Sequence, residues 1–483
     1  MHVPYQPYTM RKLWIVIMLS IVLVACRKEH GNPGPKPPTN SSDTILLAVD
    51  QSQQGYPISP SFEGLSFETQ ILTKNPEYLN VNNSVLIQMI KNLGPGILRI
   101  GGDTSDETDW TGAPRDPSTP ATMLTTSDID RLSAFSRASG WPVLFGLNLG
   151  SNHLDACTNE ATYVYNSLGS NLSSLQIGNE PDIYHMFGLR GTSYNAVDYS
   201  EEWETYFSAI KKNLPQVTFA GPDVANNNAG WVEVFSSNES SKVTMLDQHY
   251  YITGPASDPS INYQNLLTSS TDVLAAHLQG IKVESITNNL PYRITECNSI
   301  YGGGKVGASD VFAASLWALD FMWTVAENYG QGINFHGGKL VYSPITMSDN
   351  VVTAKPVYYG MLAFKYGNTG GTLAPVSVVN SEYNFSAHAS LNSDNTYSIT
   401  LINKDEKANI PVTIQLSNKA ASTIQIARLT APSVTSADNI TFAGSSVSAD
   451  GTFKPGPLEQ VTVNNKTFTV IVAAGSAAIV TVH

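Results

Sequence analysis

The chain has 483 residues, of which 42% are hydrophobic and 14% are charged, enough apolar side chains for one large core and a second domain. This composition excludes a disordered protein. The 40 acidic and 27 basic residues give a formal net charge of −13, which argues against nucleic acid as a partner because phosphate backbones bind basic surfaces.

The N-terminal residues have the pattern of a signal peptide. Arg11 and Lys12 precede an apolar run over 13–24, which is followed by Ala25 and Cys26. The run is about a dozen residues, too short for a membrane span of about twenty. Its end resembles the lipobox of bacterial lipoproteins, so we expect residues 1–26 to be a lipoprotein signal peptide and Cys26 to be lipidated. An ordinary secretory signal is the alternative.

Residues 27–44 are rich in Pro, Gly, Asn and Ser and predict an extended tether. We therefore expect a protein held in the bacterial cell envelope at the outer membrane, with the lipid anchor as its sole membrane contact. Besides Cys26, the chain has only Cys157 and Cys297. Two cysteines predict neither a disulfide framework nor a metal cluster, and we expect no metal, no cofactor and a monomer.

Between residues 56 and 367, short β-type runs alternate with longer helical runs, a pattern typical of a parallel sheet with crossover helices. The predicted strands are Phe62–Glu68, Ile97–Gly101, Phe145–Leu149, Ser174–Gly178, Val217–Ala220, Val243–His249, Tyr292–Glu296 and Gly332–His336. Eight such units in about 280 residues predict a (β/α)8 TIM barrel. A doubly wound open sheet is the rival, but no glycine-rich phosphate turn follows the first strand.

The character of the sequence changes near residue 368. From there to residue 483, short β-type runs are separated by Asn, Gly, Pro and Ser, with no helical pattern, which predicts a C-terminal β-sandwich domain. The segment 45–55 is also strand-like and is a candidate extra strand of that domain. We expect the domain to brace the barrel rather than to bind glycan independently, because no aromatic cluster stands out in it.

Two glutamates end predicted barrel strands, where the active sites of such barrels lie. Glu180 follows the fourth strand within Gly178-Asn179-Glu180-Pro181, and Glu296 ends the seventh. Retaining glycoside hydrolysis needs one carboxyl group to protonate the leaving oxygen and a second, about 5 Å away, to attack the anomeric carbon. We predict Glu180 as the acid/base and Glu296 as the nucleophile. The alternative is that both glutamates cap helices or form surface ion pairs.

Several motifs around these glutamates resemble glycoside hydrolase family 79, the β-glucuronidases and heparanases. They are the residues 98–102 (LRIGG), 178–182 (GNEPD), 295–304 (TECNSIYGGG), 334–338 (NFHGG) and 356–360 (PVYYG). The resemblance covers about residues 60–370 and extends into the tail. It implies a TIM barrel with Glu180 as acid/base and Glu296 as nucleophile.

The resemblance also implies substrate contacts. Asn179 matches a residue that donates a hydrogen bond to the sugar 2-hydroxyl, and Glu68 matches an acid that binds hydroxyls on the far side of the sugar. Tyr250 matches a tyrosine that steadies the nucleophile. Asp103 departs from the family, which more often has a small neutral residue there. We expect this extra carboxylate either to repel a uronate or to bind another hydroxyl.

The uronate carboxyl group is matched to the loop after the nucleophile. The resemblance implies that Tyr301, the backbone amides of Gly302 and Gly303, and Tyr342 bind this group. Glycine suits the role because a chain without Cβ can bring its N–H groups against a carboxylate. The alternative is that these glycines form only a flexible turn.

We therefore expect a retaining exo-glycosidase that removes terminal β-linked glucuronic acid, or its 4-O-methyl form, from oligosaccharides or glycans. Endo cleavage of heparan sulfate is disfavoured because it requires a basic cleft and the chain has few Lys and Arg. A neutral-sugar β-glycosidase of the same superfamily is the alternative within the enzyme class. A non-catalytic glycan-binding surface lipoprotein is the alternative outside it.

Overall fold

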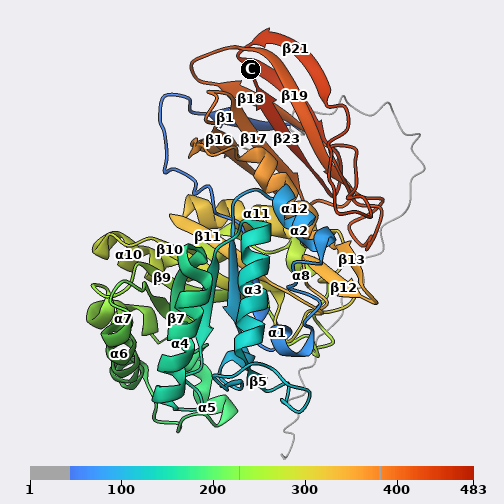
Figure 1. Ribbon diagram of the computed structural model, residues 1–483. Coiled ribbons are helices and arrows are strands. Elements are labelled where there is room, and N and C mark those ends of the chain that lie inside the picture. Colours follow the sequence, from blue (N-terminus) through green and yellow to red (C-terminus); the bar gives the residue numbers. More distant parts are fainter. Residues whose placement is uncertain (1–43, 228, 380–381) are drawn as a thin grey trace, which may run out of the picture. The chain divides into compact units, whose positions relative to one another are not determined.

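The computed structural model describes residues 44–227, 229–379 and 382–483 (Figure 1). The predicted signal peptide, lipidation site and all but the last residue of the predicted tether lie outside these residues. Within the described part of the chain, every helix is too short or too polar to cross a membrane.

Eight parallel strands form one sheet in the order β7-β6-β3-β2-β11-β10-β9-β8. Their bounds are β2 Gly64–Glu68, β3 Ile97–Gly101, β6 Val143–Leu147, β7 Leu172–Ile177, β8 Ala220–Val224, β9 Met245–Thr253, β10 Tyr292–Ile300 and β11 Gly330–His336. A parallel bridge between Leu175 and Phe219 joins the two end strands, so the sheet is nearly closed. The prediction of a (β/α)8 barrel is confirmed.

The strand β8 differs most from its predicted range, Val217–Ala220. The sequence Gly221-Pro222 would normally end a strand because proline has no N–H to donate. The strand instead runs through Pro222, which pairs in register with Asp247 of β9. Because β8 is an end strand of the sheet order, its other side needs few ladder hydrogen bonds and the proline is tolerated.

Helices follow the strands and cover the barrel. Their bounds are α1 Ile71–Lys74, α2 Ser84–Asn92, α3 Thr126–Ser139, α4 Leu154–Leu168, α5 Tyr184–Phe187, α6 Ala196–Asn213, α7 Trp231–Glu239, α8 Gln264–Leu267, α9 Thr271–His277, α10 Gln279–Asn288, α11 Ala313–Glu327 and α12 Pro356–Gly367. The start of α3 is fixed by a capping box in which Thr125 and Asp128 satisfy each other's backbone N–H groups. Gly140 ends this helix in the left-handed conformation.

The C-terminal domain consists of two sheets. One has the order β15-β1-β18-β22, and the other has the order β14-β16-β17-β23-β19-β20, with β21 paired to β19. The bounds are β1 Ile45–Val49, β14 Thr372–Leu373, β15 Val376–Val379, β16 Phe385–Leu391, β17 Tyr397–Asn403, β18 Ile410–Leu416, β19 Ala421–Thr430, β20 Thr441–Phe442, β21 Glu459–Asn465, β22 Thr467–Val472 and β23 Ser476–Val482. Apolar side chains of both sheets share one core, as in a β-sandwich. Short pairs β4 Asp109–Trp110 with β5 Met123–Leu124, and β12 Ile345–Ser348 with β13 Val351–Ala354, lie outside both domains' main sheets.

The first described strand belongs to this second domain. β1 pairs in parallel with β18 and antiparallel with β15, and Figure 1 shows this blue strand among the orange and red strands of the C-terminal domain. Its burial alternates along the strand, so Ile45, Leu47 and Val49 enter the sandwich core.

Four ionisable side chains connect the barrel to the sandwich. His388 on β16 contacts Glu327 (2.7 Å) and Asp320 (2.9 Å), both on α11, and Lys404 contacts the second oxygen of Asp320 at 2.7 Å. The ring of His388 also stacks on Trp323 of α11. Burial alone would lower the pKa of His388, but the two carboxylates raise it to about 9. The histidine is therefore a cation, and opposite charges hold α11 against the sandwich.

Candidate active site

Glu180 lies three residues after the end of β7, in a turn that only a few residue types adopt easily. Gly178 has φ 82°, and Glu180 itself has φ 51° and ψ 51°, in the left-handed region. A non-glycine residue held there costs of order 1 kcal/mol, and such residues cluster at functional sites. The Glu180 N–H donates to the backbone oxygen of Asp223 (2.8 Å), which fixes the turn. Its side chain remains 13% exposed, so it can meet a substrate.

Glu296 lies on β10, with its carboxylate held by three neighbours. Arg99 donates to Oε2 at 2.8 Å, the hydroxyl of Tyr251 donates to Oε1 at 2.8 Å, and His336 Nδ1 lies 3.3 Å from Oε2. Burial alone would raise the pKa of Glu296. The charges of His336, His249 and Arg99, with the Tyr251 hydrogen bond, lower this pKa to about 2. Glu296 is therefore ionised at neutral pH, as a nucleophile must be.

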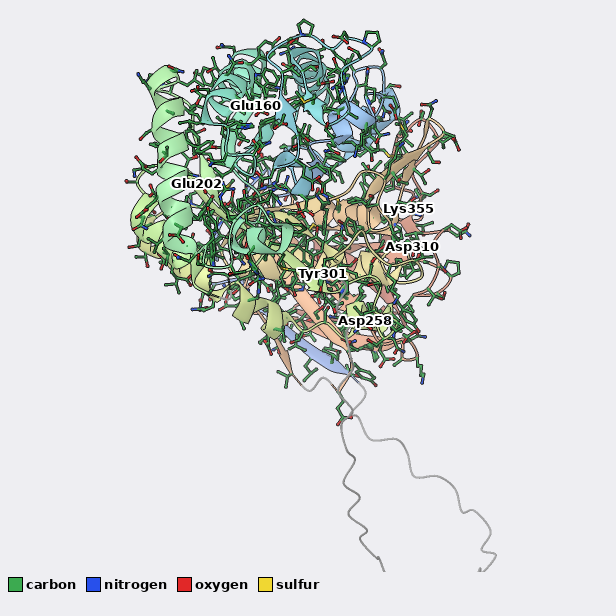
Figure 2. All side chains as sticks on the ribbon, turned by 90° about the horizontal axis from the view of Figure 1, so that it is seen from below. Glu160, Glu202, Asp258, Tyr301, Asp310 and Lys355 are labelled. Carbon is green, nitrogen blue, oxygen red and sulfur yellow. The ribbon has the colours of Figure 1, made fainter. Side chains whose placement is uncertain are left out.

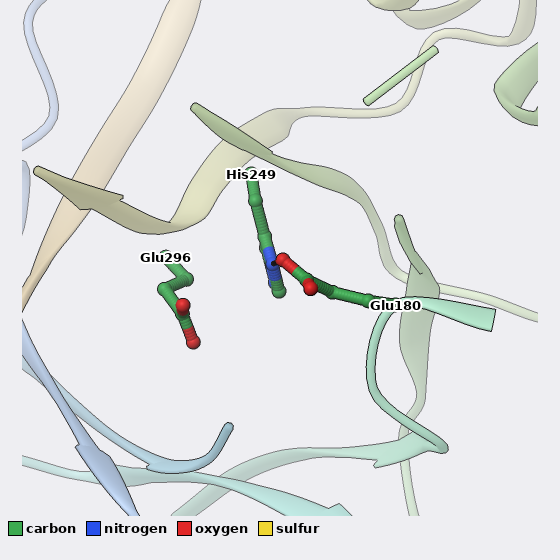
Figure 3. Close-up of side chains that lie close together, drawn as sticks. All are labelled: Glu180, His249 and Glu296. Atoms are coloured by element: carbon green, nitrogen blue, oxygen red, sulfur yellow. Dashed lines mark hydrogen bonds and ion pairs between the residues drawn. The ribbon is translucent and has the colours of Figure 1, made fainter. Parts of the chain in front are cut away.

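The two glutamates face each other across a short gap. One ligand atom each from Glu180, His249 and Glu296 lie within 4.8 Å of one another (Figure 3). Retaining glycosidases have carboxyl groups about 5–5.5 Å apart, and inverting ones about 6.5–9.5 Å. The spacing therefore leaves no room for a water molecule between the second carboxylate and the sugar, and it fits direct attack by Glu296.

His249, near the middle of β9, bridges the acid/base to a buried aspartate. Its Nδ1 lies 2.8 Å from Glu180 Oε1, and its Nε2 lies 2.9 Å from Asp223 Oδ1. Burial would lower the pKa of His249, but Asp223 and Glu296 raise it well above its usual value. The protonated ring can donate to both carboxylates, so it orients Glu180 and can exchange a proton with it.

Arg99, on β3, is the buried cation at the centre of the site. It is fully enclosed and donates to Asp223 (2.6 Å), Glu296 (2.8 Å) and Asn179 (2.7 Å). Burial would lower its pKa, but Asp223 and Glu296 raise it further above its usual value. The guanidinium therefore fixes the nucleophile and the residue before the acid/base in one geometry.

The spacing of Glu180, His249 and Glu296 could also suit a metal ion. However, both nitrogens of His249 are already bonded to carboxylates, and Arg99 and His336 contact Glu296. The protein thus supplies the positive charge between these carboxylates itself, an arrangement suited to proton transfer rather than to cation binding.

Asp106 ties together three loops at the carboxyl ends of the strands. Its Oδ1 accepts from the backbone N–H groups of Leu149 and Gly150, and its Oδ2 accepts from the N–H of Asn179 and from the Tyr184 hydroxyl. Burial raises the pKa of Asp106 to about 6 although these donors lower it. This carboxylate positions the Asn179-Glu180 segment without itself facing the gap between the glutamates.

Comparisons with known proteins find similarity to glycoside hydrolases. A family model described as the glycosyl hydrolase family 79 C-terminal beta domain matches residues 365–479. A β-glucuronidase of Aspergillus niger is 25% identical over 391 residues, which make up 71% of this chain and 72% of the relative. A β-glucuronidase of Neurospora crassa is 24% identical over 468 residues, 83% of this chain and 80% of the relative. Residues 365–479 thus match the C-terminal domain of glycoside hydrolase family 79, and most of the chain is similar to β-glucuronidases.

Several solved structures share the fold of this chain. A 4-O-α-L-rhamnosyl-β-D-glucuronidase from Fusarium oxysporum 12S superposes with a TM-score of 0.73 at 22% identity, covering 90% of this chain and 100% of that one. A family 51 α-L-arabinofuranosidase from Bifidobacterium longum superposes with a TM-score of 0.71 at 14% identity, covering 92% and 100%. Because enzymes for different sugars share the fold, specificity must be argued from the pocket.

The structure corrects one predicted contact of the nucleophile. The hydroxyl that donates to Glu296 belongs to Tyr251, not to Tyr250. Side chains alternate along β9, so Tyr250 points to the outside of the barrel, where it packs on Phe321 of α11 and His277 of α9. Tyr250 therefore supports the core, and Tyr251 faces the reacting groups.

Glu68, Asp103 and Asn179 gather on one side of the gap. Glu68 accepts from the N–H (2.9 Å) and hydroxyl (2.6 Å) of Thr104 and lies 3.3 Å from His336 Nε2. Burial would raise the pKa of Glu68, but His336 and Thr104 lower it overall. The Asn179 amide donates to Asp103 at 3.3 Å. Three polar side chains from three strand ends thus face one space.

The loop after β10 has the backbone that its sequence predicts. Gly302, Gly303 and Gly304 have φ of 82°, 89° and 83°, the left-handed region that favours glycine. A Cβ on Gly304 would lie 2.7 Å from the backbone nitrogen of Tyr342, so the chain here requires close approach. Tyr342 is buried, and its hydroxyl lies 3.4 Å from that of Tyr251, beside the nucleophile. Tyr301, labelled in Figure 2, directly follows β10 and is 46% exposed, and among the described residues its side chain makes no hydrogen bond to either glutamate.

Several residues of the site carried signals in the sequence from which a functional role could have been predicted. An arginine within the apolar strand Ile97–Gly101 signals a buried, paired charge, because arginine is rarely fully buried otherwise. His249 and His336 sit in or at the ends of barrel strands, where polar residues are functional. Asp223 had no such signal, because the sequence Gly221-Pro222 predicts the end of a strand just before it.

Proposed function

We propose that this protein is a retaining exo-β-glucuronidase that releases terminal β-linked glucuronic acid, or its 4-O-methyl form, from glycans. The observation that carries the mechanism is the pair Glu180 and Glu296, with carboxylate oxygens within 4.8 Å and with Glu296 held ionised by three cations. The observation that favours a glucuronide is the name of the two relatives that align with most of the chain, both β-glucuronidases.

The reaction proceeds by two displacements. Glu180 gives its proton to the glycosidic oxygen while Glu296 attacks the anomeric carbon, so the bond to the leaving group breaks and a glycosyl ester forms on Glu296. Glu180 then takes a proton from water, whose oxygen displaces Glu296 from the same carbon. Two inversions give net retention. Asn179, fixed by Arg99, donates to the 2-hydroxyl as the oxocarbenium-like state develops.

The uronate group is assigned to the loop after the nucleophile. The backbone N–H groups of Gly302 and Gly303 and the hydroxyls of Tyr301 and Tyr342 are uncharged donors. Such donors can bind a carboxylate without adding a cation to a pocket whose cations already neutralise Glu68 and Glu296. The positive φ of the glycines is the observation in favour of this role.

The test uses the protein without residues 1–26 on 4-nitrophenyl β-glucuronide, with the β-glucoside, β-galactoside and β-xyloside alongside. We expect selective glucuronide release that is abolished in Glu180→Gln and Glu296→Gln. NMR of the first-formed anomer should report the β form, and a 2-fluoro glucuronyl inactivator should label Glu296. Initial release of the α anomer would contradict the two-displacement mechanism.

A neutral-sugar β-glycosidase is the second candidate. The observation that favours it is Asp103, a carboxylate beside Glu180 and Glu68 that would repel a uronate whenever it is ionised. Preferential release from the glucoside, galactoside or xyloside in the same assay would establish this reading and exclude the glucuronidase.

We also propose that the protein is a monomer, lipid-anchored through Cys26 in the bacterial outer membrane. The support is the sequence of residues 11–26 alone. Expression in a Gram-negative host with a labelled fatty acid should label the native chain but not Cys26→Ala. Labelling of both, or of neither, would contradict lipidation at Cys26.

A further inference from the structure

Asp103 is a carboxylate of the pocket that neither of the proposed displacement steps uses. It follows Gly102, whose φ is 74°, at the carboxyl end of β3. A Cβ on Gly102 would lie 2.6 Å from the Glu68 carboxylate, and Thr104 on the other side donates to Glu68. The chain around Asp103 is thus pressed against Glu68.

On its other side Asp103 meets the residue before the acid/base. Its Oδ1 accepts a hydrogen bond from the Asn179 amide at 3.3 Å, while the Asn179 carbonyl oxygen accepts from Arg99 at 2.7 Å. Asn179 is held from both ends, and its second amide hydrogen is free of these two contacts. Asp103 therefore stands between Asn179 and Glu68 along the wall of the pocket.

The charge state of Asp103 suits a hydrogen bond to a hydroxyl. Asp103 is an exposed residue, and its carboxyl group accepts a hydrogen bond from the Asn179 amide. Burial, then the charges of Glu180, Glu68 and Glu296, raise the pKa of Asp103 to about 8, although His336 opposes this. Near neutral pH the group carries a proton and can both donate and accept.

The order of these side chains matches the order of hydroxyls on a hexopyranose ring. In the proposed function Asn179 meets the 2-hydroxyl, and the family resemblance implies that Glu68 meets a hydroxyl on the far side of the sugar. Asp103 lies between Asn179 and Glu68, so it faces the sugar hydroxyl that lies between the two hydroxyls they bind. We propose that Asp103 binds the 3-hydroxyl of the sugar that Glu296 attacks, and that it makes an unsubstituted 3-hydroxyl a requirement of the substrate. This inference rests on the proposed orientation of the sugar against Asn179.

The test is a cycle that removes the hydroxyl and the carboxyl group separately and together. Native protein and Asp103→Ala are assayed on 4-nitrophenyl β-glucuronide and on its 3-deoxy and 2-deoxy forms. A hydrogen bond of this kind is worth about 3- to 10-fold or more in kcat/KM. We expect the 3-deoxy change to lower kcat/KM about tenfold in the native protein but less than about threefold in Asp103→Ala. The 2-deoxy change should cost both proteins equally.

Two outcomes would overturn the inference. Equal losses on the 3-deoxy substrate in both proteins would mean that Asp103 does not meet this hydroxyl. Coupling to the 2-deoxy substrate instead would mean that Asp103 acts only by positioning Asn179. Glu107→Ala, an exposed acid on the same loop, is the matched control and should leave the native pattern unchanged.

The proposed function is tested separately, by comparing the native protein's activity on the glucuronide and on the neutral glycosides. Native protein that cleaves a neutral 4-nitrophenyl glycoside in place of the glucuronide would refute the uronide specificity. The cycle would then be run on the 3-deoxy and 2-deoxy forms of that glycoside, where coupling to the 3-hydroxyl would still support the role of Asp103 and its absence would still overturn it.

Discussion

Replacement of Lys404 by methionine should destabilise the protein strongly although the residue is far from the catalytic glutamates in sequence. Lys404 is 5% exposed and lies 2.7 Å from Asp320, which it helps to keep ionised inside the interface of α11 with the sandwich. Removal of one partner from a buried charge pair costs about 3–5 kcal/mol, because the other charge stays buried without full compensation. With an unfolding entropy of about 2.1 cal/mol/K per residue and over 400 folded residues, the Tm should fall by about 3–5 °C.

Calorimetry and urea unfolding measure this loss, with Lys407→Met as the control because Lys407 is exposed nearby. The double variant Asp320→Leu, Lys404→Met should recover part of the stability, since His388 then has only Glu327 to neutralise. A Lys404→Met protein within about 1 kcal/mol of the Lys407→Met protein would refute the claim that these charges hold α11 to the sandwich.

Three further predictions concern single side chains. Tyr251→Phe should lower kcat/KM by roughly tenfold or more and, because the lost donor favoured ionised Glu296, should move the acidic limb of the pH profile to higher pH, while Tyr250→Phe should change neither. Glu63 is 3% exposed, its carboxyl oxygens have no hydrogen-bond partner among the described residues, and burial raises its pKa well above the usual value. The native state therefore loses stability as pH rises above the unfolded pKa of about 4.3, so Glu63→Gln should raise the Tm at pH 7 but not at pH 4, and equal shifts at both would contradict the burial argument. Ionisation of Asp103 above about pH 8 should raise KM for a glucuronide but not for a neutral glycoside, and Asp103→Asn should abolish that rise.

Strand ends made the main site residues predictable. Glu68, Glu180 and Glu296 each close an apolar run, and the barrel topology brings such ends to one face whatever the strand pairing.

The error at Tyr250 had a local cause. His249 and Tyr251 share one side of β9 by the two-residue period of a strand, and that period, not the adjacent tyrosine, decides which residue meets the nucleophile.

The charge network could not be predicted in the same way. Arg99 meets Asp223 and Glu296 because β3, β8 and β10 curve around one axis, and each contact joins residues more than a hundred positions apart. No local pattern encodes which buried cation faces which carboxylate. The raised pKa of Asp103 has a similar origin, since it depends on burial first and then on three carboxylates at the ends of three other strands.

The position of β1 has a consequence for how the chain must assemble. This strand lies inside its sheet, between β15 and β18, so the barrel is inserted between the first and second strands of the sandwich. Residues 45–49 form an uncharged and apolar run. During synthesis this run cannot pair until residues 376–379 and 412–416 have been made. Until then the run is exposed to other nascent chains, which makes it the segment most prone to mispairing. A shortened chain that begins at the barrel would also leave β15 and β18 with open edges, so the catalytic domain cannot be excised by a single cut at either end.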